Sequence, residues 1–329
     1  MRKIGKFLLL VLLTLAALLA LVWSSLALHF GGFDPNWVGS FFAILWPALI
    51  VGGLLFAKSR KWTALFFVIG FGTIVIWWMG VEPSGEGSFQ AETSRHAWAE
   101  FQGDKVTVHE VRNFNYRSGS EFDPHFETRS LKLSEVTSLD LGISYWDGLK
   151  NIAHTFLSFG IGKDEYLCVS VEVRKEKGQD FEVLPGIFKQ YELSYVWADE
   201  RDVIGVRTNY RNEEVFLYRT TCTAEDSRML LEDMLKSSTA LREKSIFYNT
   251  LTQNCTSTLV GHVNHVLPKK IPWYNRRFQN GLGDRRAFDQ GWLKRYGTFE
   301  ETKKRAHVNA RAQAAGKAKD FSKQIRAAE

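Results

Sequence analysis

Cys255 has the residue type and the local setting that thiol chemistry requires. It follows the polar run YNTLTQN (Tyr248–Asn254) and precedes an apolar stripe at helical spacing, Leu259–Val266. We therefore expect a helix from Cys255 to His265, with Asn254 or Thr252 as its N-terminal cap. The positive end of the helix dipole and the first-turn N–H groups favour a thiolate there. The same N–H groups would face an oxyanion formed when the sulfur attacks a carbonyl carbon.

A nucleophilic cysteine also needs a base, and His154 is the candidate. It lies in AHTFLSFG (residues 153–160), ahead of a strand-like run that carries Ser170 and Glu172. Glu172 is the expected orienting group because a carboxylate accepts a hydrogen bond from imidazole; Ser170 is the alternative. The two candidates lie 101 residues apart in the sequence, so spacing alone does not show that they meet. A small buried cysteine between a helix and a sheet is the competing interpretation.

The surrounding pattern indicates the elements that must position these residues. Alternating residues predict strands at Val106–Val111, Tyr166–Val173, Ile204–Thr208 and Val215–Tyr218. Helical spacing predicts helices at Tyr145–Asn151, at Ala224–Leu235 with Thr223 as a cap, and at Cys255–His265. Because no regular helical crossovers separate the strands, we expect an α+β fold with an antiparallel sheet.

Other polar groups are weaker candidates. Residues 199–202 (DERD) are interpreted as a salt-bridged turn rather than a substrate clamp. Residues 112–117 (RNFNYR) fit surface pairing as well as they fit the lining of a site. His262 and His265 are one helical turn apart, but no third ligand completes the set. We therefore expect no metal and no cofactor.

The first 80 residues contain three uncharged hydrophobic runs. A spanning helix needs about 20 mostly apolar residues, and Phe7–Leu28, Phe41–Ala57 and Ala64–Gly80 meet or approach this length. We predict three transmembrane helices. A cleaved signal peptide is the alternative for the first run, but its 22 residues exceed a usual signal core.

Basic residues predict the orientation of these helices. They precede the first run and lie between the second and third, and the loop His29–Gly39 has none: Arg2, Lys3, Lys6, Lys58, Arg60 and Lys61. Positive loops stay in the cytoplasm. We therefore expect a cytoplasmic N-terminus and a periplasmic soluble domain, in the inner membrane of a bacterium.

Charge is unevenly distributed along the soluble part. The net charge is +6, whereas the chain from Lys269 onward has 16 Lys and Arg against 6 Asp and Glu. We expect the Ala-, Lys- and Arg-rich tail Glu300–Glu329 to be a solvated helix or a frayed extension, with contact to anionic lipid headgroups as an alternative. Nucleic acid is not an expected partner, because the compartment excludes it.

The three cysteines are an odd number for an oxidising compartment, so at least one thiol is free or intermolecular. Cys168 lies within a strand-like run, and Cys222 directly follows another. They either form a disulfide or are inert packing residues, and we favour the second interpretation.

The stretch from about Asn113 to His265 resembles the Lnb-type N-terminal periplasmic domain family, whose bacterial relatives include lipoprotein N-acyltransferases. The resemblance lies in NFNYRS, DLGISYWDGLKNIAHTFLSFG, SVEVR, YELSYVWADERDVI and YNTLTQNCTSTL, which begin at residues 113, 140, 170, 191 and 248. The order of histidine first and helix-start cysteine later also resembles circularly permuted papain-like enzymes.

The resemblance implies a nucleophile at Cys255, a base at His154 and a polar orienting group on the following strand, for which Glu172 is favoured over Ser170. We expect Asn254, Thr256, Ser170 and Tyr248 to contribute to substrate binding or to the oxyanion site. The implied organisation is a membrane anchor (1–80), a linker and domain entry (81–105), a papain-like catalytic domain (106–270) and a basic C-terminal extension (271–329).

The implied function is acyl transfer through a thioester, with a membrane lipid and a lipoprotein as substrates. Two alternatives stay open. The first is a cell-wall peptidase or amidase that uses the same Cys–His pair with water as the acceptor. The second is a non-catalytic module that binds lipid or a partner protein. An apolar lining near Cys255 would favour a lipid, and a polar groove would favour a peptide.

Overall fold

The computed structural model describes residues 2–146, 153–272 and 280–326. The chain divides into two compact units. The first is the membrane anchor, residues 1–83 with 181–191; the second is the soluble domain, residues 84–180 with 192–329.

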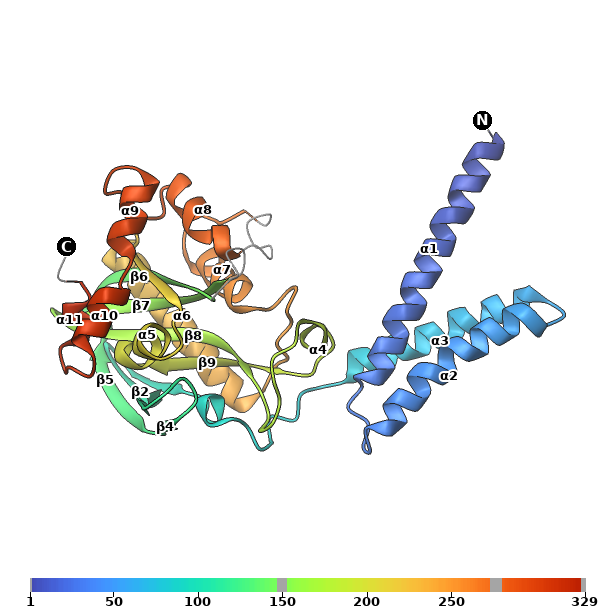
Figure 1. Ribbon diagram of the computed structural model, residues 1–329, viewed down its shortest axis with the longest axis horizontal. Helices are drawn as coiled ribbons and strands as arrows, with labels where there is room; N and C mark the ends of the chain where they lie inside the picture. Colours follow the sequence, from blue (N-terminus) through green and yellow to red (C-terminus); the bar gives the residue numbers. More distant parts are fainter. Residues whose placement is uncertain (1, 147–152, 273–279, 327–329) are drawn as a thin grey trace. The chain divides into compact units, whose positions relative to one another are not determined.

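The anchor contains helices α1 (Arg2–His29), α2 (Trp37–Phe56) and α3 (Arg60–Gly80) (Figure 1). All three are long and apolar enough to cross a bilayer. The predicted spans are thus confirmed to within a few residues. Trp46 on α2 donates a hydrogen bond from Nε1 to Ser24 Oγ on α1, at 2.8 Å, so the indole N–H finds its partner inside the helix bundle.

A segment between two strands of the soluble domain belongs to the anchor. Residues Phe181–Tyr191, with the short helix α4 (Val183–Ile187), pack on the loop ends of α1 and α3. Phe188 stacks on Phe30 and meets Trp78 edge to face. Lys189 Nζ donates to the carbonyl oxygens of Trp78 and Val81, at 2.7 and 2.8 Å. These bonds cap carbonyl groups that the end of α3 leaves without helical partners.

The soluble domain is organised around one large sheet, in the order β1-β2-β9-β8-β7-β6-β10, with β5 also pairing with β2. Its pairings are antiparallel except at Arg112 and Ala198, where β2 and β9 run parallel. A separate hairpin joins β3 and β4. The strands are β1 (Trp98–Gln102), β2 (Lys105–Arg112), β3 (Asn115–Tyr116), β4 (Phe122–Asp123), β5 (Phe126–Lys132), β6 (Val136–Tyr145), β7 (Ala153–Ile161), β8 (Glu165–Arg174), β9 (Glu192–Ala198) and β10 (Glu214–Arg219).

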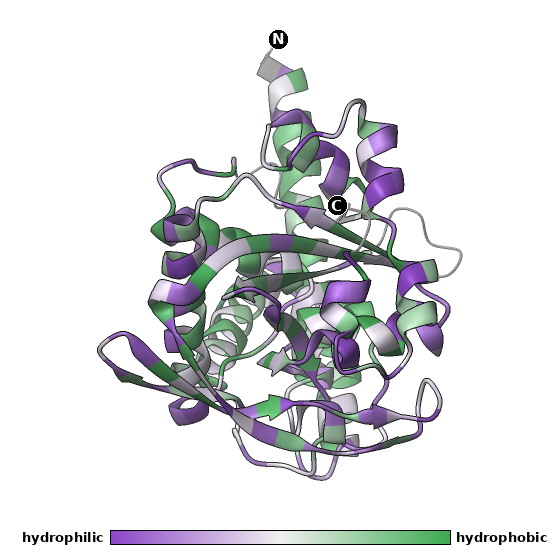
Figure 2. Cartoon of the chain, turned by 90° about the vertical axis from the view of Figure 1, so that its left-hand side faces the viewer, coloured by the Kyte–Doolittle hydropathy of each residue, from purple (hydrophilic) through white to green (hydrophobic). Residues whose placement is uncertain are grey.

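Helices cover both faces of this sheet (Figure 1). Helix α6 (Ala224–Glu243) crosses one face, and α7 (Cys255–Val266) lies beside it. Helix α5 (Glu200–Asn209) covers the other face together with the C-terminal helices α10 (Asn309–Ala315) and α11 (Phe321–Gln324). Two further helices, α8 (Gly283–Asp289) and α9 (Phe299–Ala306), lie near the β10 side. Helices in Figure 2 carry hydrophobic and hydrophilic residues on different sides, as expected for helices that cover a sheet. Helix α5 is an exception, because nearly all of its residues are buried.

The C-terminal region is not the solvated extension that its composition predicted. Ala312, Phe321 and Ile325 are buried in a core cluster with residues of the sheet. Arg326 bonds Asp140 Oδ2 at 2.7 Å and Glu200 Oε1 at 2.6 Å. Small alanines of α10 are buried in the same core cluster as residues of α5. The predicted boundary at 270/271 therefore falls inside the soluble unit.

The predicted linker is also partly structured. The soluble unit begins at Ser84, and Gly85 N donates to Glu192 Oε1 at 2.8 Å. Strand β1, placed by prediction in the domain entry, is part of the main sheet. The entry segment is held because Arg174, which pairs with Glu192 at 2.9 Å, also donates to Gly85 O.

One secondary-structure prediction is wrong, and another falls mostly outside the described residues. The predicted strand Ile204–Thr208 is part of helix α5, which begins where Asp199 accepts a bond from Arg201 N. This helix is buried on nearly all sides, so its short apolar run has no helical periodicity to reveal it. The predicted helix Tyr145–Asn151 begins on a residue that ends strand β6; residues 147–152 lie outside the described part of the chain. The strands predicted near β2, β8 and β10 and the helices predicted near α6 and α7 are confirmed.

Candidate active site

Helix α7 begins at Cys255, as predicted from the polar residues before it. Asn254 is the cap: its side chain accepts a bond from Ser257 N at 2.9 Å, and Ser257 Oγ accepts one from Asn254 N at 2.8 Å. Asn254 Nδ2 also donates to Thr250 O. The Asn254 side chain is therefore committed to capping rather than to substrate binding. Its effect on Cys255 is to fix the thiol in the first turn of the helix, where the dipole favours the anion.

Cys255 and His154 meet at the start of strand β7. The two side chains are close enough for each to shift the pKa of the other, and Thr155 also acts on the pKa of Cys255. A further bond joins the two elements next to this pair, because Thr155 Oγ1 lies 3.1 Å from Thr256 Oγ1. Residues about a hundred positions apart in the sequence are thus brought into contact where α7 begins beside β7.

The imidazole is oriented from strand β8. His154 Nε2 lies 2.6 Å from Ser170 Oγ, and Ser170 Oγ donates to Glu172 Oε1 at 2.6 Å. Glu172 Oε1 is also 3.3 Å from His154 Nε2. The register explains the approach: Phe156 pairs with Ser170, so His154 and Glu172 lie opposite each other on the same face. Both predicted orienting candidates therefore contact the histidine, and Ser170 lies between the other two groups.

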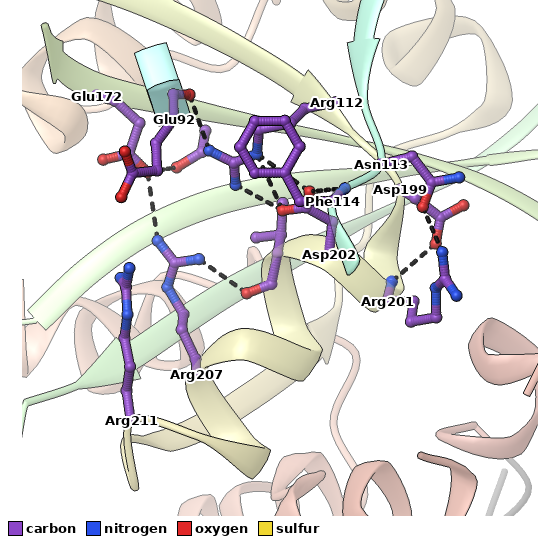
Figure 3. Close-up of polar contacts among 12 residues, drawn as sticks. Glu92, Arg112, Asn113, Phe114, Glu172, Asp199, Arg201, Asp202, Arg207 and Arg211 are labelled. Carbon is purple, nitrogen blue, oxygen red and sulfur yellow. Dashed lines mark hydrogen bonds and ion pairs between the residues drawn. The ribbon is translucent and has the colours of Figure 1, made fainter. Parts of the chain in front are cut away.

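Arg207 on α5 completes this network behind the histidine. Its Nη2 lies 3.3 Å from Glu172 Oε1, and its Nη1 donates to Val203 O at 2.8 Å. Figure 3 shows the guanidinium reaching from α5 toward Glu172. Arg207 Nε is also 3.6 Å from Glu213 Oε2, a carboxylate that accepts a bond from Ser144 Oγ. The arginine is buried, so its charge acts on Glu172 with little screening by solvent.

The electrostatics favour an ion pair between the thiol and the imidazole. Burial would raise the pKa of Cys255, but the hydrogen bond and charge of His154 outweigh it and lower that pKa to about 7. Burial would lower the pKa of His154, but the Glu172 charge and the bond to Cys255 raise it to about 9. Burial also opposes ionisation of Glu172, yet His154 and Arg207 hold its pKa well below the usual value. Between about pH 7 and about pH 9, Cys255 is therefore a thiolate, His154 an imidazolium and Glu172 a carboxylate.

Tyr248 is also at the site. Its pKa is raised, first by burial and then by the charges of Cys255 and Glu172. The phenol therefore stays protonated and can donate a hydrogen bond close to the reacting sulfur. Among the predicted substrate-binding residues, Tyr248 and Thr256 lie beside the thiol, whereas Asn254 caps the helix and Ser170 orients the base.

An apolar cavity of about 150 Å³ adjoins this cluster on the α7 side of the sheet. Thr155 and Thr256, the chain neighbours of His154 and Cys255, form part of its wall. The rest of the wall comes from β6, β7, α7, α8 and the segments after β10, α7 and α8. It consists mainly of apolar side chains: Leu139, Leu141, Ile143, Leu157, Leu259, Val260, Val263, Ile271, Ala287, Trp292 and Leu293. A lining of this kind fits a hydrocarbon chain better than a peptide.

The weaker candidates lie elsewhere and have structural roles. Arg112 pairs with Asp202 at 2.6 Å in the protein interior, as Figure 3 also shows, and Arg117 makes exposed pairs. His262 and His265 both bond Asp233, at 2.6 and 2.9 Å. Among the described residues, no group of three or more His, Cys, Asp or Glu side chains could hold a metal ion.

Cys168 and Cys222 are each free thiols, so they do not form a disulfide with one another. Cys168 is buried in the core cluster under α5, and Cys222 lines the apolar cavity.

The sequence did not indicate Arg207, Thr155 or the cavity. Arg207 was hidden because α5 was mistaken for a strand. Thr155 directly follows the candidate base His154. Because successive residues of a strand point to opposite faces of the sheet, the sequence could have placed Thr155 on the face opposite His154. The cavity joins segments that are far apart in the chain, and no local pattern marks it.

Residues 122–280 match the family model of the Lnb N-terminal periplasmic domain. The predicted family is confirmed. The match spans somewhat under half of the chain and includes His154, Ser170, Glu172 and Cys255. It covers neither the three apolar helices α1–α3 nor the C-terminal helices α9–α11. No curated protein and no solved structure matches the chain.

The family match and the three apolar helices together identify a membrane protein with a periplasmic domain. The Lnb-type segment includes the core strands of the sheet and helix α7. It therefore contains every residue of the hydrogen-bonded set that begins at Cys255 and ends at Arg207.

Proposed function

We propose that this Lnb-type domain is a cysteine-dependent acyltransferase that takes an acyl chain from a membrane lipid or lipoprotein ester. The observation that supports this best is the contact between Cys255 and His154 beside an apolar cavity. A binding module has no need for a thiol of lowered pKa held by an oriented histidine. A peptidase would be better served by a polar groove than by the apolar wall found here.

The first half of the proposed reaction forms a thioester. Nε2 of His154 is engaged with Ser170 and Glu172, which leaves Nδ1 to take the thiol proton. The thiolate attacks the ester carbonyl carbon, and a first-turn amide such as that of Thr256 donates to the resulting oxyanion. When the tetrahedral intermediate collapses, the C–O bond breaks and His154 returns its proton to the leaving alcohol oxygen.

The second half releases the acyl chain to an amine. By family resemblance, the acceptor is the α-amino group of a lipidated cysteine. The amine nitrogen attacks the thioester carbonyl, His154 accepts the amine proton, and the C–S bond breaks to leave an amide and the regenerated thiolate. Water in place of the amine would give hydrolysis, so the acceptor alone separates a transferase from a hydrolase.

The anchor suits such a substrate. Lipid esters are confined to the bilayer surface, and tethering the domain there raises the effective concentration of both partners. The basic residues before α1 and between α2 and α3 support a cytoplasmic N-terminus and a periplasmic soluble domain in the inner membrane of a bacterium. The papain-like ancestry is part of the same proposal, since a histidine on a strand precedes a cysteine at a helix start.

The test is labelling of the detergent-solubilised full chain with a thiol-directed activity probe. We expect fast labelling at pH 8 that disappears in Cys255→Ala and falls at least tenfold in His154→Ala. Cys168→Ala, which removes a core thiol away from the site, should label like the wild type. Labelling of Cys255 no faster than that of a free thiol, or unchanged in His154→Ala, would contradict the proposal.

A further inference from the structure

We infer that the soluble domain docks directly on the bilayer surface through three exposed apolar side chains around the candidate active site: Trp146, Leu251 and Leu282, hereafter the apolar rim. This inference rests on the proposed function for its purpose, since docking would bring a lipid ester to Cys255. It does not require the chemistry to occur, so the two can fail separately.

The rim is distinguished by exposure. In the part of the soluble domain that the structure describes, these are the only large hydrophobic side chains that are exposed, at 39 % for Trp146, 42 % for Leu251 and 43 % for Leu282. Scattered exposed apolar residues are normal on soluble proteins and carry no meaning by themselves. Docking is supported here by the position of the three residues, because all of them lie next to the candidate active site or its cavity.

Each rim residue is next to a group that forms the site or its cavity. Trp146 follows Tyr145, which pairs across the sheet with Ala153, the neighbour of His154. Leu251 lies in the turn closed by the backbone bonds between Asn249 and Gln253, just before the cap of α7.

Leu282 immediately precedes Gly283, which lines the apolar cavity. It is also tied to the position of Trp146, because Tyr145 Oη donates to Gly281 O at 3.1 Å. The β7–β8 turn at residues 162–164, at the other end of strand β7, has no such side chain. The exposed apolar residues therefore gather at the one end of the sheet where Cys255 lies.

Cations accompany the rim. Lys269 and Lys270 are exposed and immediately precede Ile271, a residue of the cavity wall. Lys269 Nζ donates to the carbonyl oxygen of Gln290, another residue of that wall, at 2.7 Å. Tryptophan favours the headgroup region, and lysines beside it are attracted to anionic lipids. This combination of apolar tips and flanking cations is complementary to an anionic bilayer surface.

A second copy of the chain is a poorer occupant. A stable protein interface takes roughly 20–30 residues a side, and the rim has three large apolar side chains. Insertion into a bilayer does not need a large matched surface, because each side chain enters the interface individually. The three membrane helices already hold the domain near a bilayer, so shallow insertion has only to orient it.

Depth-sensitive spin labelling of the full chain tests this inference. The three native cysteines are replaced (Cys168→Ala, Cys222→Ala, Cys255→Ala), and a nitroxide is attached at Leu251→Cys or Leu282→Cys. Lys163→Cys, exposed in the β7–β8 turn, is the matched control. The protein is reconstituted in vesicles of phosphatidylethanolamine and phosphatidylglycerol, and collisions with oxygen and with a water-soluble nickel chelate are compared.

We expect the labels at positions 251 and 282 to collide more often with oxygen than with nickel, and the label at 163 to show the reverse. Nickel-accessible labels at all three positions would overturn the inference. So would labels at 251 and 282 shielded from both reagents, which would indicate a protein partner. Because this chain lacks Cys255, immersion is measured without catalysis. Fast thiol labelling without immersion refutes only the docking, and immersion without fast labelling refutes only the enzyme.

Discussion

His154 Nε2 lies 2.6 Å from Ser170 Oγ, so a serine hydroxyl stands between the candidate base and its carboxylate. A serine has one hydroxyl proton, and Ser170 uses it to donate to Glu172. The hydroxyl therefore accepts from the Nε2–H of His154. This fixes the tautomer of the neutral imidazole and leaves Nδ1 as the basic atom toward Cys255.

This arrangement predicts unequal effects for the two partners of His154. Ser170→Ala removes the bridging hydroxyl but keeps the carboxylate charge, because Glu172 Oε1 is itself 3.3 Å from Nε2. Glu172→Gln removes the charge. At metal-bound histidines, loss of such orienting partners typically costs about 10–100-fold in activity, and we apply the same range to His154. We expect the serine variant near the lower end and the glutamine variant near the upper end, measured as the rate of acyl transfer. Equal losses of the acyl-transfer rate in the two variants would contradict the smaller effect predicted for Ser170→Ala.

The pH dependence should have two separate limbs. His154 lowers the pKa of Cys255 to about 7. Below that pH the thiol is protonated, so alkylation of Cys255 slows. Above about pH 9 the imidazolium of His154 loses its proton, so the thiolate persists but no acid remains to protonate the leaving alcohol. We therefore expect alkylation to reach a plateau where acyl transfer declines, when both rates are measured from pH 5 to 10.

Glu172→Gln supplies the control for that profile. Without the carboxylate, the pKa of His154 falls and the ion pair with Cys255 weakens, so the acid limb of alkylation should move above pH 7. If the acid limb of the alkylation profile stays at about pH 7 in this variant, Glu172 does not act through His154.

Arg207 should be important for stability as well as for the site. It is buried and its partners Glu172 and Glu213 would lose a cation in Arg207→Met. Removing one partner of a buried ion pair leaves an uncompensated charge and costs about 3 kcal/mol or more. Chemical denaturation of the detergent-solubilised chain, followed by near-ultraviolet circular dichroism, measures this loss. Arg117→Met, which removes an exposed arginine with two carboxylate partners, should leave the midpoint unchanged.

Filling the apolar cavity should change the preference for acyl chain length. Ala287 on α8 lines the wall, and Ala287→Trp places an indole in the space assigned to the chain. We expect transfer from long-chain donors to fall at least tenfold relative to short-chain donors. The matched control is Ala314→Trp, which adds the same bulk at an exposed position of α10. A uniform loss for all chain lengths would argue against an acyl site in this cavity.

Local sequence signals predicted the parts of the site that are set by local structure. The polar run before Cys255 and the apolar stripe after it sufficed to place the start of α7, because capping involves neighbours such as Asn254 and Ser257. The alternation around Ser170 and Glu172 likewise placed both on one face of a strand. The span lengths of the anchor follow directly from hydrophobicity.

What could not be predicted depends on tertiary contacts. Helix α5 is covered on nearly every side, so it lacks the amphipathic period by which helices are recognised, and Arg207 was missed with it. The tail was expected to be solvated because nothing local shows that Arg326 would pair with Asp140 and Glu200. The apolar cavity forms where the fold brings together Leu157 and Trp292, which are far apart in the sequence.

The most direct test of the central claim is detection of an acyl chain on Cys255. The full chain is reconstituted with phospholipid carrying an alkyne-tagged acyl chain, quenched in acid and measured by intact mass spectrometry and peptide mapping. We predict a mass increase of one acyl group on the peptide containing Cys255. Neutral hydroxylamine should remove this acyl group, and the thioester should be absent in Cys255→Ser. An unmodified Cys255 in a chain whose thiol labels rapidly, with diverse lipid esters present, would contradict acyl transfer.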